Sequence, residues 1–268
     1  MDIVFDLGGT NMRIASADRG VIGEVHKVPT PRDPQEAIAG IVRLATAAAG
    51  GPIANIVGCS RWFVIDGIFQ KGDDILPGWG DFPLAKELSR MLGAPVRIVH
   101  DTAAAGVGEV HHGAGKGSAI CAYITVSTGV GGDRIVDGTI DRSTFNPEVG
   151  RQLIDGVELG DLISGTAVRK KYDIEPKDLA DEDIRNGLAD ILATGLYNTV
   201  MHWSPDTIVL GGSMIVGMNP IPIARAEASL RSMLKHYLKA PAVKMAQLGD
   251  NGGLIGAAIL AERALSTA

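Results

Sequence analysis

Cysteine is scarce in this sequence, with Cys59 and Cys121 the only two among 268 residues. They lie far apart, form no Cys-x-x-Cys unit and build no disulfide framework, which favours a reducing, cytoplasmic environment. Both stand in apolar runs, so we expect two small, buried side chains.

Aromatic residues and clustered positive charge are also in short supply. Aromatics make up 4% of the chain, too few for the stacking platforms that single-stranded nucleic acid requires. The formal net charge is −6 and no basic stripe is present, so duplex nucleic acid is not an expected partner. The N-terminus lacks the regions of a signal peptide, and no apolar run reaches the length of a membrane span.

Two common nucleotide-binding motifs are absent as well. In a GxxxxGK[ST] loop the lysine precedes Ser or Thr, but here Gly117 follows Lys116. The GxGxxG pattern fails because Arg134 stands where a third glycine would have to follow Gly129 and Gly131. A P-loop enzyme and a dinucleotide-binding fold are therefore disfavoured.

Apolar strands and helical stripes alternate along the chain, and this predicts an α/β fold. We expect strands at residues 3–5, 13–17, 21–28, 54–58, 96–99, 119–126 and 207–210, and helices at 34–49, 84–92, 160–172, 181–203, 222–238 and 252–264. The glycine-rich stretch Gly113–Gly117 indicates a hinge. Two lobes are predicted, residues 1–113 with 254–268 and residues 114–253.

The segment FDLGGTNMRIA, residues 5–15, is the most informative. Gly8 and Gly9 are expected to adopt positive φ and to let the backbone approach a ligand. Thr10 and Asn11 add short polar side chains and backbone N–H groups that can cradle phosphate oxygens. The plainer interpretation is a tight hairpin with a polar tip.

Asp6 and Arg13 flank that tip. A carboxylate beside a phosphate would repel it unless a cation lies between them, and Mg²⁺ held by one or two carboxylates and phosphates meets this need. Arg13 adds positive charge nearby.

The segment TVSTGVGGDRIV, residues 125–136, repeats the same order of strand, glycine-rich turn and returning strand. Its candidate ligand-binding residues are Thr128, Gly129 and Gly131. Two such hairpins, one in each predicted lobe, suit a shared phosphate-containing ligand.

Asp101 follows a strand and precedes a predicted helix start, Thr-Ala-Ala-Ala. One interpretation is a helix N-cap. The other is a general base for a substrate hydroxyl, which tolerates a weak base because the phosphoryl-transfer transition state is loose. The two roles are compatible.

Two further segments carry candidates. In the loop 146–151, Glu148 and Arg151 can hydrogen-bond sugar hydroxyls, although a lone loop Glu is usually solvated. The strand 207–210 runs into Gly211, Gly212 and Ser213, where a flat base can lie against the backbone; a plain connection is the alternative.

Taken in order, these segments resemble the ROK family of repressors and sugar kinases. The motifs that carry the resemblance are DLGGTNMRIA (6–15), HDTAAAGVGE (100–109), TVSTGVGGD (125–133), PEVGR (147–151), DTIVLGGS (206–213) and LGDNGGLIGAAILA (248–261). The resemblance implies a two-lobed, actin-like ATPase fold of the ribonuclease H-like class with a central cleft, ATP and Mg²⁺ as cofactors, and a homodimer.

The resemblance also implies residue roles. Asp101 would be the base and Asp6 would serve the metal, while the two hairpins would hold the phosphates of ATP. Glu148, Arg151 and Glu158 would contact the sugar, with Asp161 a rival for the place of Glu158.

The departures from the family pattern concern the sugar side. The cysteine-rich zinc segment is missing, so we expect no structural zinc. Arg151 replaces the zinc-associated His, His100 replaces the Asn before the base, and Cys59-Ser60-Arg61-Trp62 replaces a Gly-Pro-Gly loop. Arg61, His100 and Arg151 would suit an acidic or otherwise substituted sugar. Alternatively, Arg151 pairs with Glu148 or another acid and fills the space of the metal.

The sequence thus predicts an ATP-dependent kinase for a hydroxyl of a hexose or hexose derivative. The alternative is a non-enzymatic, sugar-sensing binding module of the same fold. Family repressors carry a helix-turn-helix ahead of the kinase-like part, and a first strand beginning at Asp2 leaves no room for one in this sequence.

Overall fold

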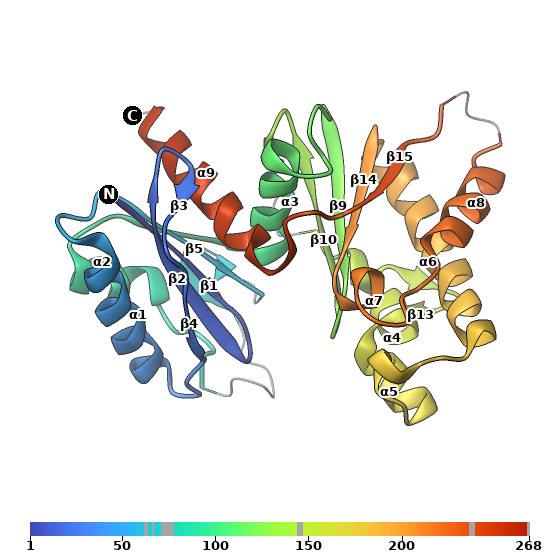
Figure 1. Ribbon diagram of the computed structural model, residues 1–268, viewed down its shortest axis with the longest axis horizontal. Helices are drawn as coiled ribbons and strands as arrows, with labels where there is room; N and C mark the ends of the chain where they lie inside the picture. Colours follow the sequence, from blue (N-terminus) through green and yellow to red (C-terminus); the bar gives the residue numbers. More distant parts are fainter. Residues whose placement is uncertain (62–63, 66, 71–77, 144–146, 236–238, 267–268) are drawn as a thin grey trace. The chain divides into compact units, whose positions relative to one another are not determined.

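The computed structural model describes residues 1–61, 64–65, 67–70, 78–143, 147–235 and 239–266, with side chains through residue 263. The chain forms two compact units: unit 1 comprises Met1–Gly108 and Asp250–Ala268, and unit 2 comprises Glu109–Gly249. Each unit is built on one main sheet with helices packed against it (Figure 1), so the α/β prediction is confirmed.

The sheet of unit 1 has the strand order β3-β2-β1-β5-β8, and β4 also pairs with β2. Its strands are β1 (Asp2–Leu7), β2 (Asn11–Asp18), β3 (Val21–Ile22), β4 (His26–Pro29), β5 (Ile56–Ser60) and β8 (Val96–His100). β1 and β2 form an antiparallel hairpin, whereas β1, β5 and β8 run parallel. The parallel strands therefore end at the same edge of the sheet, which is the edge where Asp6 and Asp101 lie.

Helices cover both faces of this sheet. α1 (Pro34–Ala49) and α2 (Leu84–Leu92) lie on one face, and α9 (Gly252–Ser266) lies on the other (Figure 1). Ile3, Phe5 and Leu7 belong to the core beneath α1 and α2. Because side chains alternate along a strand, Asp6 points to the face that α9 covers. A short hairpin, β6 (Val64–Ile65) and β7 (Ile68–Phe69), completes the unit.

The sheet of unit 2 has the order β11-β10-β9-β14-β15. The strands are β9 (Ile120–Val126), β10 (Val130–Val136), β11 (Thr139–Ile140), β14 (Thr207–Gly211) and β15 (Ala242–Met245), with a separate hairpin of β12 (Leu153–Ile154) and β13 (Val157–Glu158). β9 and β10 are antiparallel, and β9, β14 and β15 are parallel. This pattern matches that of unit 1, as the repeated hairpin motif predicted.

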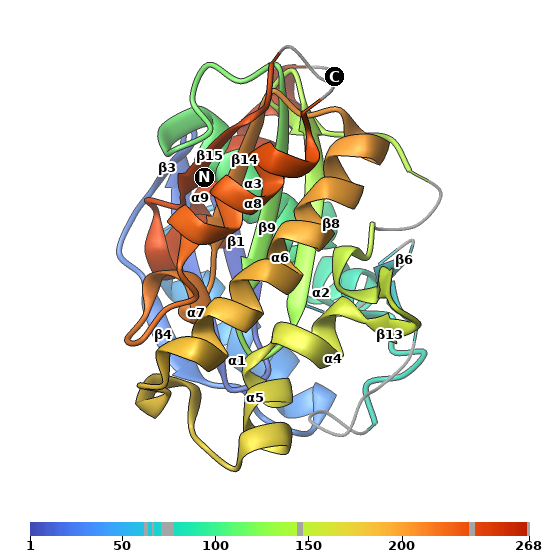
Figure 2. The same ribbon diagram turned by 90° about the vertical axis from the view of Figure 1, so that its right-hand side faces the viewer.

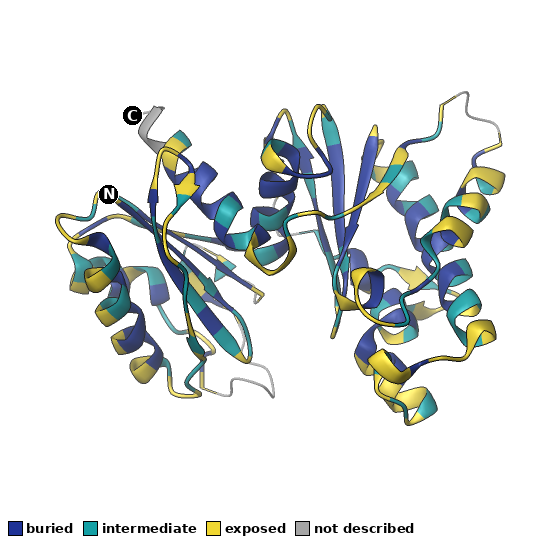
Figure 3. Ribbon diagram, in the orientation of Figure 1, coloured by how far each residue is buried: buried dark blue, intermediate teal, exposed yellow. Residues whose placement is uncertain are grey.

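Helices pack over the sheet of unit 2 and enclose its core. They are α4 (Leu159–Ile163), α5 (Gly165–Tyr172), α6 (Glu182–Trp203), α7 (Ser213–Val216) and α8 (Ile223–Met233). α6 lies along the sheet with α8 against it (Figure 2). The inward faces of α6 and of the central strands are buried (Figure 3), and Leu192, Leu196 and Ile208 have no exposed surface.

Several predicted elements differ in detail. The predicted strand 21–28 forms two separate strands, β3 and β4. β3 pairs with one end of β2, at Ala17 and Asp18, and β4 pairs with the other end, at residues 11–14. The predicted helix 160–172 is broken at Ser164, whose extended backbone and Oγ cap α5. The predicted helix 222–238 ends at Met233, and its last three residues lie outside the described part.

α3 (Asp101–His112) begins at Asp101 itself, one residue earlier than predicted. The segment 113–117 that was predicted as a hinge forms turns within unit 2, and the chain passes from unit 1 to unit 2 between Gly108 and Glu109. No helix in the described part of the chain is long and apolar enough to cross a membrane.

Candidate functional site

Asp6 and Arg13 face each other across the first hairpin. They are register partners in β1 and β2, and the Arg13 guanidinium donates from Nη1 to Asp6 Oδ2 at 3.0 Å. Its second terminal nitrogen, Nη2, donates to Asp250 Oδ2 at 2.9 Å. Arg13 therefore bridges two carboxylates that are far apart in the sequence.

The other oxygen of Asp6 faces β5. Cys59 is the register partner of Asp6 on that strand. Its thiol donates a long hydrogen bond to Asp6 Oδ1, with 3.7 Å between sulfur and oxygen. Gly253 of α9 packs over the sulfur, since a Cβ there would lie 3.1 Å from Cys59 Sγ. Cys59 is fully buried, as predicted, and burial raises the pKa of its thiol well above the ordinary value.

Asp6 has an unusually high pKa for an aspartate. Burial, reinforced by the negative charge of Asp101, raises the pKa of Asp6 to about 6, against the lowering effect of Arg13. Two carboxylates that repel each other in this way form a set that a divalent cation would stabilise. The residues fit Mg²⁺, which takes carboxylate oxygens and completes its shell with water and phosphate. Within the described residues, no group of three or more His, Cys, Asp or Glu side chains gathers into a metal cage.

Asp101 lies at the carboxyl end of β8, where α3 begins. Its side chain is 39% exposed, and Oδ1 is 3.8 Å from His100 Nε2. His100 is buried, and its Nδ1 lies 2.6 Å from Thr102 Oγ1. The imidazole is thus held by Thr102 and presents its other nitrogen to Asp101, so it can orient this carboxylate.

The tip of the first hairpin is closed by few hydrogen bonds. Gly8 donates its N–H to Asn11 O at 3.1 Å, and Thr30 Oγ1 donates to Gly8 O at 2.7 Å. Within the described residues, the N–H groups of Gly9 and Thr10 donate to no protein acceptor. These two donors remain available to an anion, in the manner of a backbone nest.

The expected positive φ at Gly8 and Gly9 is wrong, because neither is among the residues with φ > 0. Close packing explains Gly8 instead, since a Cβ there would lie 2.8 Å from Asn11 O. Arg61 is exposed at the end of β5, and Trp62 of the same predicted loop lies outside the described residues.

The second hairpin lies beside the end of β14 in unit 2. Ser127 Oγ and Ser213 Oγ are 3.1 Å apart, which joins the turn 127–129 to the Gly211–Ser213 segment. The N–H groups of Thr128 and Gly129 donate to no protein acceptor within the described residues, and a Cβ on Gly129 would meet no atom within 4 Å. The open space over Gly129 and the two N–H groups suit the approach of an anion.

Glycines flank Thr125 on both neighbouring strands. Gly131 of β10 and Gly211 of β14 are both register partners of Thr125 on β9. Gly212 has φ 89°, and a Cβ there would collide with the backbone of Val126. The glycine at 212 is thus required by the fold itself, whatever it binds.

Residues at the start of α5 hold the turn of the second hairpin through hydrogen bonds. Gly165 donates its N–H to Ser127 O at 2.7 Å, and Thr166 donates from both N and Oγ1 to Thr128 O. These bonds occupy the carbonyls of Ser127 and Thr128, whereas the N–H groups of Thr128 and Gly129 have no acceptor among the described residues. Thr166 could not be found from local sequence patterns, because its partner is 38 residues away.

Three of the predicted substrate residues, Glu148, Arg151 and Glu158, gather in unit 2, whereas Arg61 and His100 belong to unit 1. Arg151 Nε is 3.7 Å from Glu148 Oε2, and Arg151 Nη1 is 3.5 Å from Glu158 Oε1. Glu158 lies at the end of the β12–β13 hairpin, whereas Asp161 is exposed on α4 with no ion pair among the described residues. One arginine between two acids leaves this group with a net negative charge.

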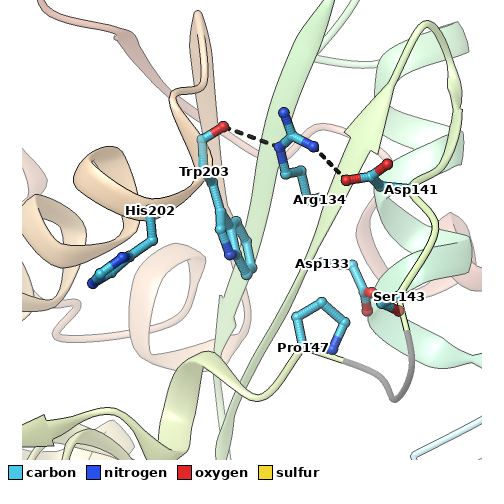
Figure 4. A pocket seen from close by; sticks show the side chains of 7 residues that line it. All are labelled: Asp133, Arg134, Asp141, Ser143, Pro147, His202 and Trp203. Carbon is cyan, nitrogen blue, oxygen red and sulfur yellow. Dashed lines mark hydrogen bonds and ion pairs between the residues drawn. The ribbon is translucent and has the colours of Figure 1, made fainter.

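Unit 2 also has a cavity of about 310 Å³ at the edge of its sheet (Figure 4). It is lined by Asp133, Arg134, Asp141, Ser143, Pro147, His202 and Trp203. Arg134 forms an ion pair with Asp141 and donates from Nε to Trp203 O at 3.0 Å. The Arg134 guanidinium thus connects Asp141 on one side of the cavity with the Trp203 backbone on the other.

The model of the ROK family matches residues 3–264. The chain belongs to the ROK family. This ROK protein is similar to the ROK hexokinase from Thermus thermophilus, with a TM-score of 0.86 and 26% identity over 100% of this chain and 99% of that chain. It is also similar to the inorganic polyphosphate/ATP-glucomannokinase from Arthrobacter sp. strain KM, with a TM-score of 0.70 and 25% identity over 99% and 98%.

Among sequence relatives, the fructokinase from Pediococcus pentosaceus is 27% identical over 211 residues, covering 72% of this ROK protein and 73% of the fructokinase. These likenesses confirm the predicted family and the two-lobed, actin-like ATPase fold. Sequence reasoning missed Cys59 and Asp250 as neighbours of the Asp6–Arg13 pair. Only the sheet register and the return of α9 to unit 1 bring them there.

Proposed function

We propose that this ROK protein is an ATP-dependent kinase that transfers the γ-phosphate to a hydroxyl of a hexose or hexose derivative. The pair of interacting carboxylates in unit 1, Asp6 and Asp101, carries the proposal. A partly exposed carboxylate at a strand end can accept a hydroxyl proton, while a buried one beside it serves a cation. Relatives named hexokinase, fructokinase and glucomannokinase support the reaction class.

Each unit offers groups that suit this chemistry. In unit 1, Asp101 accepts the proton of the attacking hydroxyl and orients its oxygen, and His100 holds the Asp101 carboxylate. Gly9 and Thr10 in unit 1 and Thr128 and Gly129 in unit 2 offer the free N–H groups for phosphate oxygens. The segment Gly211–Ser213, joined to the second hairpin through Ser127, is proposed to receive the adenosine.

Asp6 would hold Mg²⁺, through phosphate or water, and Arg13 would fix the orientation of that carboxylate. When bound, the cation neutralises charge that develops on the transferring phosphoryl group.

The acceptor is proposed to be an uncharged sugar. Arg151 is shared between Glu148 and Glu158, so its charge is already balanced by two carboxylates. A sugar acid or sugar phosphate would meet the remaining negative charge, whereas hydroxyl groups can donate to Glu148 and Glu158. These contacts favour the interpretation in which Arg151 fills space beside acids, and they disfavour the anionic substrate.

An ADP-release assay with ATP as donor, over neutral hexoses, N-acetyl hexosamines, sugar acids and sugar phosphates, tests the proposal. A second series with polyphosphate as donor measures the phosphorylated sugar instead, because this donor releases no ADP. Sugar-dependent ADP formation with a neutral sugar is expected. Thermal shifts with sugars but no phosphoryl transfer from either donor would support the sugar-sensing module instead. Preference for a sugar acid or phosphate would overturn the assignment of the acceptor while leaving the kinase reaction in place.

A further inference from the structure

Asp6 is held through Arg13 by a residue that sequence reasoning did not assign. Arg13 divides its two terminal nitrogens between Asp6 at 3.0 Å and Asp250 at 2.9 Å. The side chains of Arg13 and Asp6 are each 16% exposed, whereas that of Asp250 is 82% exposed. The bridge therefore runs from a nearly buried carboxylate to the surface of unit 1.

Sharing the guanidinium has an electrostatic consequence. Arginine presents a planar fork that can grip one carboxylate with two parallel bonds. Here the fork is split, so Asp6 Oδ2 receives one nitrogen, and Oδ1 has, among the described residues, only the thiol of Cys59, at 3.7 Å. A guanidinium free to turn fully onto Asp6 would occupy both oxygens and compete with a bound cation.

One short segment, residues 250–253, contacts both Arg13 and Cys59. Asp250 fixes Arg13, and three residues later Gly253 packs over Cys59 Sγ. Arg13 and Cys59, the neighbours of the two Asp6 oxygens, therefore both contact the segment 250–253 at the start of α9. The charged and titratable groups that face Asp6 are Arg13 from β2, Cys59 from β5 and Asp101 from α3.

We propose that Asp250 is a positioning residue for Asp6: by holding half of the Arg13 guanidinium it keeps Asp6 Oδ1 open to the divalent cation. The inference rests on the proposed kinase function, in which Asp6 serves that cation. Residues that orient a metal-binding carboxylate through hydrogen bonds commonly change metal affinity when they are replaced.

The test measures binding without turnover. Calorimetry would give the affinity of the non-hydrolysable ATP analogue AMPPNP, with Mn²⁺ and with EDTA, for the wild type, Asp250→Asn and Asp250→Glu. Mn²⁺ should increase the affinity for AMPPNP, and we expect this increase to be roughly 3- to 10-fold smaller in Asp250→Asn than in the wild type. The loss is smaller than is usual for a buried residue that orients a metal ligand, because Asp250 is exposed. Binding in EDTA should change little, and Asp250→Glu should restore most of the gain.

Asp18→Asn is the matched control, because Asp18 is also an exposed aspartate of unit 1 paired with an arginine, Arg19, 3.6 Å away. If Mn²⁺ increases the AMPPNP affinity of both Asn variants as much as that of the wild type, Asp250 has no such role. An equal loss of this increase in both variants would also overturn the role, because it would indicate a general effect of removing a surface charge. A wild type that binds AMPPNP with no gain from Mn²⁺ would overturn the role of Asp6 and this inference with it. The kinase proposal fails separately, through the ADP-release assay.

Discussion

Replacing Asp6 by Asn should change how the stability of the protein depends on pH. Asp6 has its pKa raised from 3.8 to about 6, chiefly by burial and then by Asp101. A group that binds its proton more tightly in the folded state stabilises the fold below its unfolded pKa, and this contribution is lost as pH rises through the folded pKa. The wild type should therefore lose the contribution of Asp6 between about pH 4 and pH 7.

The size of the effect follows from the shift. About two pKa units correspond to ~3 kcal/mol, of which ~2 kcal/mol is still present at pH 4.5 and almost none at pH 8. The Asp6 side chain is 16% exposed, so water screens part of the penalty. We expect ~1 kcal/mol of pH-dependent stability in the wild type that Asp6→Asn lacks.

Urea unfolding at pH 4.5 and pH 8, in EDTA, measures this difference for the wild type and the variant. The comparison uses only the change between the two pH values, because Asp6→Asn also alters the hydrogen bond from Arg13 at both. Carboxylates remote from Asp6 titrate equally in the two proteins and cancel. An identical pH dependence in wild type and Asp6→Asn would refute the argument that Asp6 is a buried, destabilised carboxylate.

Three further outcomes are expected. Asp101→Asn should retain AMPPNP binding and lose on the order of 100-fold or more in turnover, measured by ADP release; full activity would remove Asp101 from the mechanism. Elemental analysis of the purified protein should find no tightly held zinc, and one zinc per chain would contradict this. Burial raises the pKa of Asp206, but hydrogen bonds from Ile120, Ser118, Thr207 and Ala119 outweigh it and leave that pKa lowered. Asp206→Asn should therefore cost about 1 kcal/mol in urea unfolding at pH 7, a loss that shrinks as pH falls below about 4.

The sequence by itself determined the type of most elements and the repeated plan of the two units. Local patterns carry this information, because residues 5–15 and 125–136 both show the sequence pattern of a buried strand, a glycine-containing turn and a returning strand. The ordered motifs were also sufficient for the family, since each is read from neighbouring residues. The boundaries at Ser164 and Asp101 were less accessible, because they depend on capping and on register.

Only the tertiary structure decided which side chains share a site. Asp250 reaches Arg13 across 237 residues, and Cys59 meets Asp6 because β5 runs parallel to β1 in one particular register. Arg151 was ambiguous in the sequence between an anion-binding residue and a partner of acids, and the contacts with Glu148 and Glu158 depend on how β13 returns beside the short helix at 149–151. Pattern and propensity act over a few residues. The pKa of Asp6, in contrast, depends on burial and on Asp101, Arg13 and Cys59, which come from three separate segments that only folding brings together.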